Sequence, residues 1–250
     1  MMRKQILLLT LIVIVLMPLT SSALAGDGVA VSSSIDFFSR YVWRGLDIAN
    51  TPSLQPSLSV GASGLEFGAW GAYALSNEAF DADEIDFWLS YTGEMKSGVS
   101  VTGLVTDYYF PNAGIDFFNF NNYDAVKNDT IPDPGAHTFE LGLSVTGPSS
   151  FPVTLSGYVN IYNDAGSNTY FQLDYPVAAK ETELNFFCGV AGGSKDNPGY
   201  YGADDVSVIN LGVNAVRAIK VSESFTIPLS VSLIVNPKAE ITHLVAGMSF

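Results

Sequence analysis

The chain contains few of the residues that most often carry protein chemistry. Its 250 residues include one cysteine and two histidines, with 11 Lys and Arg against 25 Asp and Glu, for a formal net charge of −14. A single cysteine excludes an internal disulfide, and no Cys and His spacing matches a zinc site, so we interpret Cys188 as a small buried or lipid-facing hydrophobe. The acidic balance argues against nucleic-acid binding, which needs clustered basic side chains over the phosphates.

Long apolar runs are also missing beyond the N-terminal region. A membrane-spanning helix needs about 20 consecutive apolar residues, and no segment after residue 25 approaches that length. The composition is nevertheless apolar, because 48% of the residues are hydrophobic and only 14% are charged. Strands that present every second residue to lipid give this combination, so the composition permits a β-barrel in a membrane.

The N-terminus has the features of a secretory leader. Arg3 and Lys4 precede an apolar run over residues 6–17, and small residues at 21–25 form an A-x-A-like cleavage site before Gly26. We therefore predict a Sec-type signal peptide over residues 1–25 and a barrel domain over residues 26–250. A retained anchor helix is the weaker alternative, because the apolar run is short for a bilayer span.

From Val29 onward the apolar residues recur with a period of two, and no long segment has the helical period of 3.6. This pattern predicts an all-β fold, a transmembrane, antiparallel, up-and-down β-barrel of about 12 strands. Pro176 and Pro228 lie inside expected strands, where a ladder proline is unusual, so the count is open by about two. The expected strands are residues 29–43, 53–62, 65–73, 85–91, 99–105, 139–145, 153–161, 171–177, 184–190, 209–213, 225–233 and 240–250.

The last expected strand alternates apolar and small or polar residues and ends on Phe250. Leu244 and Ala246 share the face suited to lipid, and His243 lies on the opposite face. A terminal aromatic strand is typical of outer-membrane barrels, so we predict that Phe250 is a membrane-insertion signal for the barrel-assembly machinery. Because an open sheet edge is excluded in hydrocarbon, the first strand is expected to pair with the last.

The connections between the expected strands alternate in length. Short turns at Ser63, Glu94, Pro148, Lys180 and Ser222 alternate with mostly longer, polar loops at residues 46–51, 77–83, 110–136, 163–168 and 192–204. Short periplasmic turns and long external loops are the expected asymmetry of bacterial outer-membrane barrels. Aromatic residues near the strand ends, among them Tyr41, Trp43 and Tyr108, fit an interfacial girdle. The pattern predicts a bacterial outer-membrane location.

One stretch of sequence resembles a known family. The segment Ser39–Asp47 (SRYVWRGLD), followed by Pro52–Pro56, is similar to the N-terminal signature of the TorF family of porin-like proteins of proteobacteria. Residues 83–86, 91–92 and 106–111 fit the same family. The resemblance implies an outer-membrane β-barrel of porin type, does not specify a substrate and carries no catalytic residues.

Strand parity assigns a set of polar and aromatic residues to the face opposite lipid. A Lys or Arg on the lipid face near mid-membrane would cost about 2–4 kcal/mol, so charged side chains are expected to point inward. The candidate pore-lining residues are Asp36, Arg40, Arg44, Glu66, Trp70, Asp86, Trp88, Glu140, Asp174 and His243. The same parity places Glu84, Gln172, Glu183, Asn185 and Asn210 on this face.

Barrel size limits what this interior can do. Barrels of about 8 strands fill their interior with side chains, and those of about 16–18 leave an aqueous channel, so an intermediate barrel predicts a narrow passage. Rings of carboxylates favour cations. We therefore expect a porin-like channel for passive diffusion of small solutes or ions with a cation preference. The alternative is a non-conducting structural or adhesive barrel, in which Arg40 and Arg44 pair with Asp36, Glu66 or Asp86.

An enzyme is the less favoured class. A barrel-embedded lipid hydrolase needs a serine beside a histidine, but the chain has no G-x-S-x-G motif, and His137 is expected to be a loop residue. The acidic loop at 110–136 could fold inward or bind calcium, although its spacing does not match an EF-hand, and a mobile solvated loop is expected. We predict no enzyme activity, cofactor or metal. The expected partners are outer-membrane lipids and small solutes or cations, and the oligomeric state is left open.

Overall fold

The computed structural model describes residues 28–76, 79, 82–122, 135–164, 168–193, 199–223 and 225–250. The predicted signal peptide at residues 1–25 lies outside the described residues, as does part of the acidic loop at 110–136. Over the part of the chain that is described, no helix is long and apolar enough to cross a bilayer.

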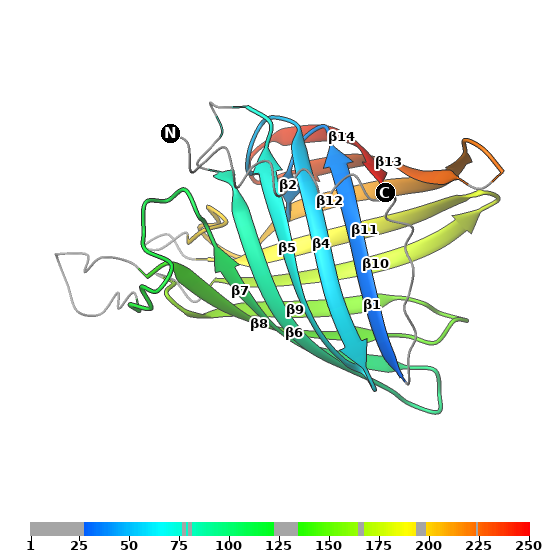
Figure 1. Cartoon of the computed structure of the whole chain (residues 1–250), viewed down its shortest axis with the longest axis horizontal. Coiled ribbons are helices and arrows are strands. Elements are labelled where there is room, and N and C mark those ends of the chain that lie inside the picture. Colours follow the sequence, from blue (N-terminus) through cyan, green and yellow to red (C-terminus); the bar gives the residue numbers. More distant parts are fainter. Residues whose placement is uncertain are drawn as a thin grey trace, which may run out of the picture.

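The described residues form a closed, antiparallel barrel of 12 strands, which confirms the predicted fold class (Figure 1). Each strand pairs with the next barrel strand along the chain, and β1 pairs with both β14 and β4. The barrel strands are β1 (Val29–Phe38), β4 (Ser53–Ala62), β5 (Leu65–Ala74), β6 (Glu84–Glu94), β7 (Ser100–Tyr109), β8 (His137–Thr146), β9 (Thr154–Tyr162), β10 (Thr169–Ala179), β11 (Thr182–Gly192), β12 (Ser207–Lys220), β13 (Thr226–Asn236) and β14 (Ile241–Ser249).

The first and last strands join at one short seam. Their register runs only from Asp36 opposite Ser249 to Phe38 opposite Gly247. At its end the Ile35 amide donates to the Phe250 carbonyl (3.1 Å), and the Phe250 amide donates to the Ile35 carbonyl (3.0 Å). The predicted pairing of first and last strands is therefore confirmed, and the backbone of Phe250 takes part in the closure.

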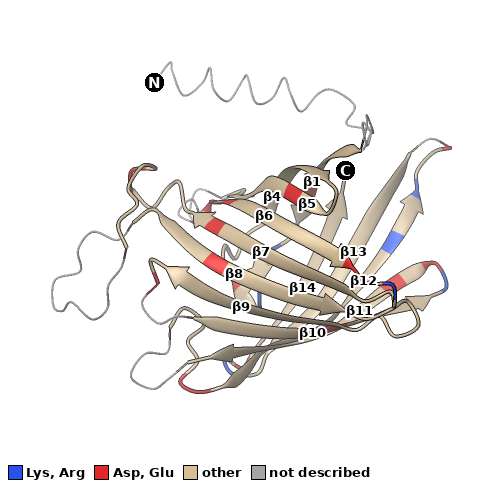
Figure 2. Cartoon of the chain, turned by 90° about the horizontal axis from the view of Figure 1, so that it is seen from below, with Lys and Arg blue, Asp and Glu red and all other residues tan. Residues whose placement is uncertain are grey.

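Side chains alternate between the two faces of the wall, with the large apolar residues outside. In β8, Leu141 is 42% exposed and Leu143 is 56% exposed. Glu140, which precedes Leu141 and faces the other way, is 2% exposed. The other strands follow this alternation, and Figure 2 shows long stretches of strand without charged residues. The two prolines that left the strand count open stay in the ladder, Pro176 opposite Asn185 and Pro228 opposite Ala218.

One predicted strand is wrong at its end. β1 stops at Phe38 rather than at Trp43, and the chain then forms a small hairpin of β2 (Val42–Trp43) and β3 (Leu46–Asp47). The physical reason is the turn between them: Arg44 has a φ of 48° and Gly45 of 81°, which an extended strand cannot adopt. Residues 39–52 are therefore a folded loop between β1 and β4.

β12 also differs from the prediction. It extends over Ser207–Lys220 instead of 209–213. Ile209, expected to share the outward face with Leu211, is fully buried. The ladder between β11 and β12 shifts register here, with Gly189 opposite Asn210 but Val190 opposite Val208, so Ile209 is the extra residue of a bulge.

Candidate functional site

The β2–β3 hairpin carries the site. Its turn at Arg44 and Gly45 has positive φ at both central residues, as in the two-residue type I′ turns of tight hairpins. Any residue with a Cβ at Gly45 would place that atom 1.9 Å from the Ile209 carbonyl oxygen of β12, so only glycine fits. Asn236 of β13 donates from Nδ2 to the Gly45 carbonyl at 3.2 Å. The tip of the hairpin therefore docks on the inner wall of β12 and β13.

Arg44 extends from this tip to the wall on the other side. Its Nη1 lies 2.6 Å from Glu140 Oε2 and its Nη2 lies 2.8 Å from Glu140 Oε1, a bidentate ion pair. The side chains are 10% and 2% exposed. β8, which carries Glu140, is five strands from β1 one way around the ring and seven the other. The pair thus links the hairpin to the wall opposite its origin.

Hydroxyl groups complete the polar contacts of this pair. Arg44 Nη1 also donates to Tyr201 Oη (2.6 Å), and Tyr108 Oη donates to Glu140 Oε1 (2.9 Å). Burial lowers the pKa of Arg44, but the hydrogen bonds to Glu140 together with the Coulomb interactions with Tyr201, Tyr108 and Glu140 outweigh burial and raise the pKa above its ordinary value. Burial raises the pKa of Tyr201 to about 12. At neutral pH the charged guanidinium of Arg44 therefore donates a hydrogen bond to the neutral phenol of Tyr201.

Aromatic rings enclose the guanidinium. Its central carbon lies 4.3 Å from the ring centroid of Trp43, 4.2 Å from that of Tyr158 and 4.6 Å from that of Tyr170. Such contacts stabilise a cation through the ring quadrupole, by about 2 kcal/mol or more when water is excluded. Tyr201 in turn stacks on Trp43 at 5.9 Å with an interplanar angle of 16°. We call Arg44, Glu140 and these rings the arginine clamp.

The sides of the hairpin pack on two apolar clusters inside the barrel. One contains Tyr170, Ala191, Tyr201, Ala203 and Ile209, with Trp43, Leu46 and Tyr158 against it. The other contains Tyr41, Ala49 and Ala72, with Trp43, Ile48 and Trp70 among the residues packed on it. The hairpin is thus wedged between opposite parts of the inner wall. It divides the lumen rather than lying along one strand.

Two cavities in the lumen meet at the hairpin. The first, which we call the vestibule, has a volume of about 220 Å³ and is lined by Glu84, Asp164 and Tyr200 among others, so it lies at the long-loop end. The second, the tryptophan cavity, has a volume of about 360 Å³ and lies deeper along β6 and β7. Trp43 and Tyr108 line both, with ring centroids 5.8 Å apart. These two rings form the partition between the cavities.

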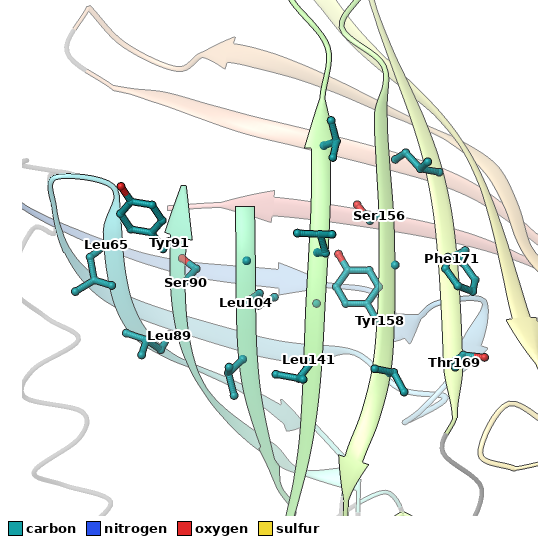
Figure 3. A pocket seen from close by; sticks show the side chains of 18 residues that line it. Leu65, Leu89, Ser90, Tyr91, Leu104, Leu141, Ser156, Tyr158, Thr169 and Phe171 are labelled. Carbon is teal, nitrogen blue, oxygen red and sulfur yellow. The ribbon is translucent and has the colours of Figure 1, made fainter. Parts of the chain in front are cut away.

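A third hollow lies on the outer wall. It has a volume of about 820 Å³, and strands β5 to β10 line it with outward apolar side chains such as Leu65, Leu141 and Phe171 (Figure 3). Leu65 is 51% exposed and Phe171 55%, which places the hollow outside the barrel. Tyr158 of the clamp and Leu104 of the tryptophan cavity also border this hollow, so only the barrel wall separates it from the lumen site.

Five of the predicted pore-lining residues come together in the lumen. Arg44 meets Glu140 in the arginine clamp, while Trp70, Asp86 and Trp88 line the tryptophan cavity. The structure places these side chains on the inner face, as parity predicted. Their lining of a conducting pore stays a prediction.

The other five belong neither to the arginine clamp nor to the lining of the two cavities. Arg40 pairs with Asp47 within the hairpin, and Glu66 accepts a hydrogen bond from Trp88 Nε1 at 3.3 Å. The remaining three are in different strands: Asp174 accepts from Gln172 and Asn185, His243 is 7% exposed, and Asp36 Oδ1 is buried without a hydrogen-bond partner among the described residues. The ion pairs of the alternative reading, between the arginines and Asp36, Glu66 or Asp86, do not form, since Arg40 pairs with Asp47 and Arg44 with Glu140.

Several aromatic residues were placed wrongly or missed. Tyr41, predicted for an interfacial girdle, is 6% exposed and donates to Glu84 Oε2 at 2.9 Å. Trp43 and Tyr108, predicted for an interfacial girdle, lie in the lumen. For Tyr41 and Trp43 the reason is the hairpin, which turns residues 39–52 inward, whereas Tyr108 faces inward from β7. Tyr108 lies two residues after Thr106 in β7, so strand alternation could have assigned both to the inner face. Nothing in the local sequence around Tyr201 marks it as a clamp residue.

His137 anchors the loop after β7. It is the first residue of β8 and 1% exposed, rather than a loop residue. Its Nδ1 lies 2.9 Å from Asp107 Oδ2, its Nε2 lies 2.7 Å from the Phe117 carbonyl, and its ring stacks on Phe120 at 4.3 Å. Both ring nitrogens are therefore engaged. In the part of the chain that is described, no group of three or more His, Cys, Asp or Glu could hold a metal ion.

Comparison with known proteins gives a family and a likeness to solved structures. A family model described as "Bacterial protein of unknown function (Gcw_chp)" matches residues 22–197. A search of curated proteins found no match. Among solved structures, the chain is similar to OmpF of Salmonella typhi in complex with daunomycin, with a TM-score of 0.36 and 8% identity. The match covers 80% of this chain and 62% of that one, so the chain spans less than two thirds of the OmpF length.

Proposed function

We propose that this chain, which belongs to the Gcw_chp family of bacterial proteins of unknown function, is a narrow, cation-preferring channel of the outer membrane. The observation that carries the proposal is a closed barrel whose large apolar side chains mostly point out, while carboxyl groups such as Glu140 and tyrosines such as Tyr170 are buried inside. We propose passive diffusion of small solutes or ions through the lumen.

The outer wall supports a membrane location. Mid-strand residues such as Leu58, Phe67 and Leu173 are 46% to 58% exposed, and they belong to different parts of the ring. Soluble monomers rarely expose contiguous apolar patches larger than a few hundred Å². A lipid environment accounts for an apolar surface that surrounds the barrel, with charged residues kept off it.

The lumen supports a cation preference. Its two arginines are neutralised by Asp47 and Glu140, and neither Glu66 nor Asp86 has an ion-pair partner among the described residues. Carboxylates along a narrow, partly desolvated path attract cations and repel anions.

The resemblance to the TorF family fits this reading. The signature segment Ser39–Asp47 folds into the hairpin and supplies both Trp43 and Arg44 of the clamp. The segment that carries the family likeness is therefore the one that divides the lumen.

Conductance measurements test the proposal. We expect the refolded full-length protein to give stepwise ion currents in planar lipid bilayers, with a reversal potential of the cation-selective sign in a salt gradient. Glu66→Gln together with Asp86→Asn should shift that potential toward zero. Glu181→Gln, which removes an exposed acid at a turn, should leave it unchanged. Flat recordings from a folded barrel would refute the channel.

A second candidate is a non-conducting structural barrel. The arginine clamp favours it, because a hairpin fixed across the lumen by a buried bidentate pair blocks much of the passage. The same recordings decide between the two. Conductance that appears only after the clamp is broken would assign the structural role to the intact protein.

We also propose that the protein is not a lipid hydrolase. A general base needs a free ring nitrogen, and both nitrogens of His137 are engaged by Asp107 and the Phe117 carbonyl. Phospholipid hydrolysis by the purified protein that is lost in His137→Ala would contradict this.

A further inference from the structure

The tryptophan cavity gathers all three tryptophans of the chain. Trp43 comes from the hairpin, Trp70 from β5 and Trp88 from β6, and each lines the same space of about 360 Å³. That volume lies at the lower end of the about 300–1,000 Å³ typical of small-molecule sites. The cavity is therefore large enough for a small organic molecule.

The position of Trp88 is fixed by its neighbours. A Cβ at position 68 would lie 2.2 Å from the Trp88 ring, so Gly68 leaves the space that the indole occupies. Trp88 Nε1 donates to Glu66 at 3.3 Å. Trp70 is likewise held, with its ring centroid 5.4 Å from that of Tyr41. The aromatic walls are thus preorganised, which lowers the entropic cost of binding a ligand.

Asp86 brings a carboxyl group with no basic partner among the described residues to this cavity. It lines the space, and its Oδ1 is buried with no hydrogen-bond partner among the described residues. Glu84 lies two residues before Asp86 on the same face of β6, so a second carboxyl group is close to it. Two neighbouring carboxyl groups in a buried site disfavour each other's ionised form, and a cation beside them favours it.

The rest of the lining selects among cations. Ser90, Thr102 and Thr106 offer hydroxyl groups, and Leu104 offers apolar surface. One carboxylate and a few hydroxyls are a poor substitute for the water shell of a small metal ion, which prefers several oxygen ligands. Aromatic faces instead favour weakly hydrated cations such as substituted ammonium groups.

We propose that the tryptophan cavity binds a small organic cation, an ammonium group on an apolar or aromatic body. The ammonium lies beside Asp86, and the body packs between the tryptophan rings. This deepens the proposed channel function, on which it rests, by naming the class of solute that the lumen holds. A neutral sugar would also stack on the rings, but it cannot compensate the charge of Asp86.

Tryptophan fluorescence tests the proposal, because every tryptophan of the chain lines the cavity. The full-length protein, folded in detergent, is titrated with 2-phenylethylammonium, the matched neutral 2-phenylethanol and glucose. We expect saturable quenching by the ammonium, with an affinity at least about tenfold higher than that of the alcohol, as loss of a charge-assisted contact implies. Asp86→Asn should lose about tenfold in affinity for the ammonium and little for the alcohol.

Controls separate binding from folding and from conduction. Glu181→Gln removes the same charge at an exposed turn and should bind like the wild type. If Asp86→Asn fails to fold, Trp88→Leu serves as the second variant. It should weaken binding of both phenyl compounds, measured by the fluorescence of the two remaining tryptophans. Equal affinity for ammonium and alcohol, or quenching by glucose alone, overturns the proposal. Conductance without ammonium binding refutes the binding site but supports the channel. Ammonium binding without conductance supports the binding site but refutes the channel.

Discussion

The substitution Arg44→Asn separates the clamp from the turn that carries it. Arg44 has a φ of 48°, a left-handed conformation that asparagine adopts more readily than arginine. Asparagine therefore suits the turn next to Gly45, but it is too short to reach Glu140 and has no charge. Any release of the hairpin in this variant follows from the lost clamp and not from a broken turn.

The size of the effect follows from the buried ion pair. Removing one partner of such a pair costs about 3–5 kcal/mol, because the other charge stays buried and unpaired. Glu140 is 2% exposed while the hairpin is docked, and undocking lets water reach it, so the cost falls on the docked state. Asparagine adopts the left-handed turn conformation more easily than arginine, which stabilises the docked hairpin by about 1 kcal/mol. The net loss of about 2–4 kcal/mol lowers the ratio of docked to undocked hairpin roughly 30- to 900-fold.

Single-channel recording measures this change. We expect Arg44→Asn to raise the mean conductance and the current noise in planar bilayers, because an undocked hairpin leaves the lumen wider. Glu140→Ala should have a similar effect, and the double variant should add little to either, since both remove one interaction. A folded Arg44→Asn barrel with wild-type conductance and noise would refute the idea that the clamp holds a constriction.

Three further perturbations test other parts of the structure. Gly45→Ala places a Cβ against the Ile209 carbonyl and should raise the conductance as Arg44→Asn does; an unchanged conductance would show that the tip is not docked there. Leu141→Arg, in the middle of β8, should lower the free energy of unfolding in lipid vesicles by about 2–4 kcal/mol. The control Leu75→Arg, beyond the end of β5, should lower it by about 0–1 kcal/mol. Equal losses in the two variants would contradict a lipid-facing wall. His137→Ala removes the contacts to Asp107 and the Phe117 carbonyl and should speed proteolysis of residues 110–122, whereas unaltered cleavage would refute the anchor.

The barrel could be predicted from the sequence because its causes are local and periodic. Alternation along each strand places Leu141 outside and Glu140 inside, and the alternating loop lengths indicate the up-and-down order. The same parity brought Trp70, Asp86 and Trp88 to the inner face, where the structure has them. The proposed membrane location rests on this pattern as well.

The hairpin could not be predicted in this way. Its sequence, with Tyr41 and Trp43 alternating with Val42 and Arg44, reads as a continuation of β1, and only Gly45 signals a turn. The clamp joins residues that are 96 and 157 positions apart in the chain, so no local pattern pairs Arg44 with Glu140 or Tyr201. Such contacts follow from barrel closure, which sequence periodicity does not position.

The docking of Gly45 has a consequence for the order of assembly. The hairpin tip rests on Ile209 and receives its hydrogen bond from Asn236, a partner 191 residues further along the chain. Contacts between distant segments form late, because the intervening chain must first be arranged. The N-terminal hairpin can therefore dock only once the C-terminal strands β12 and β13 have formed. We expect the folding barrel to pass first through a stage with an unobstructed centre.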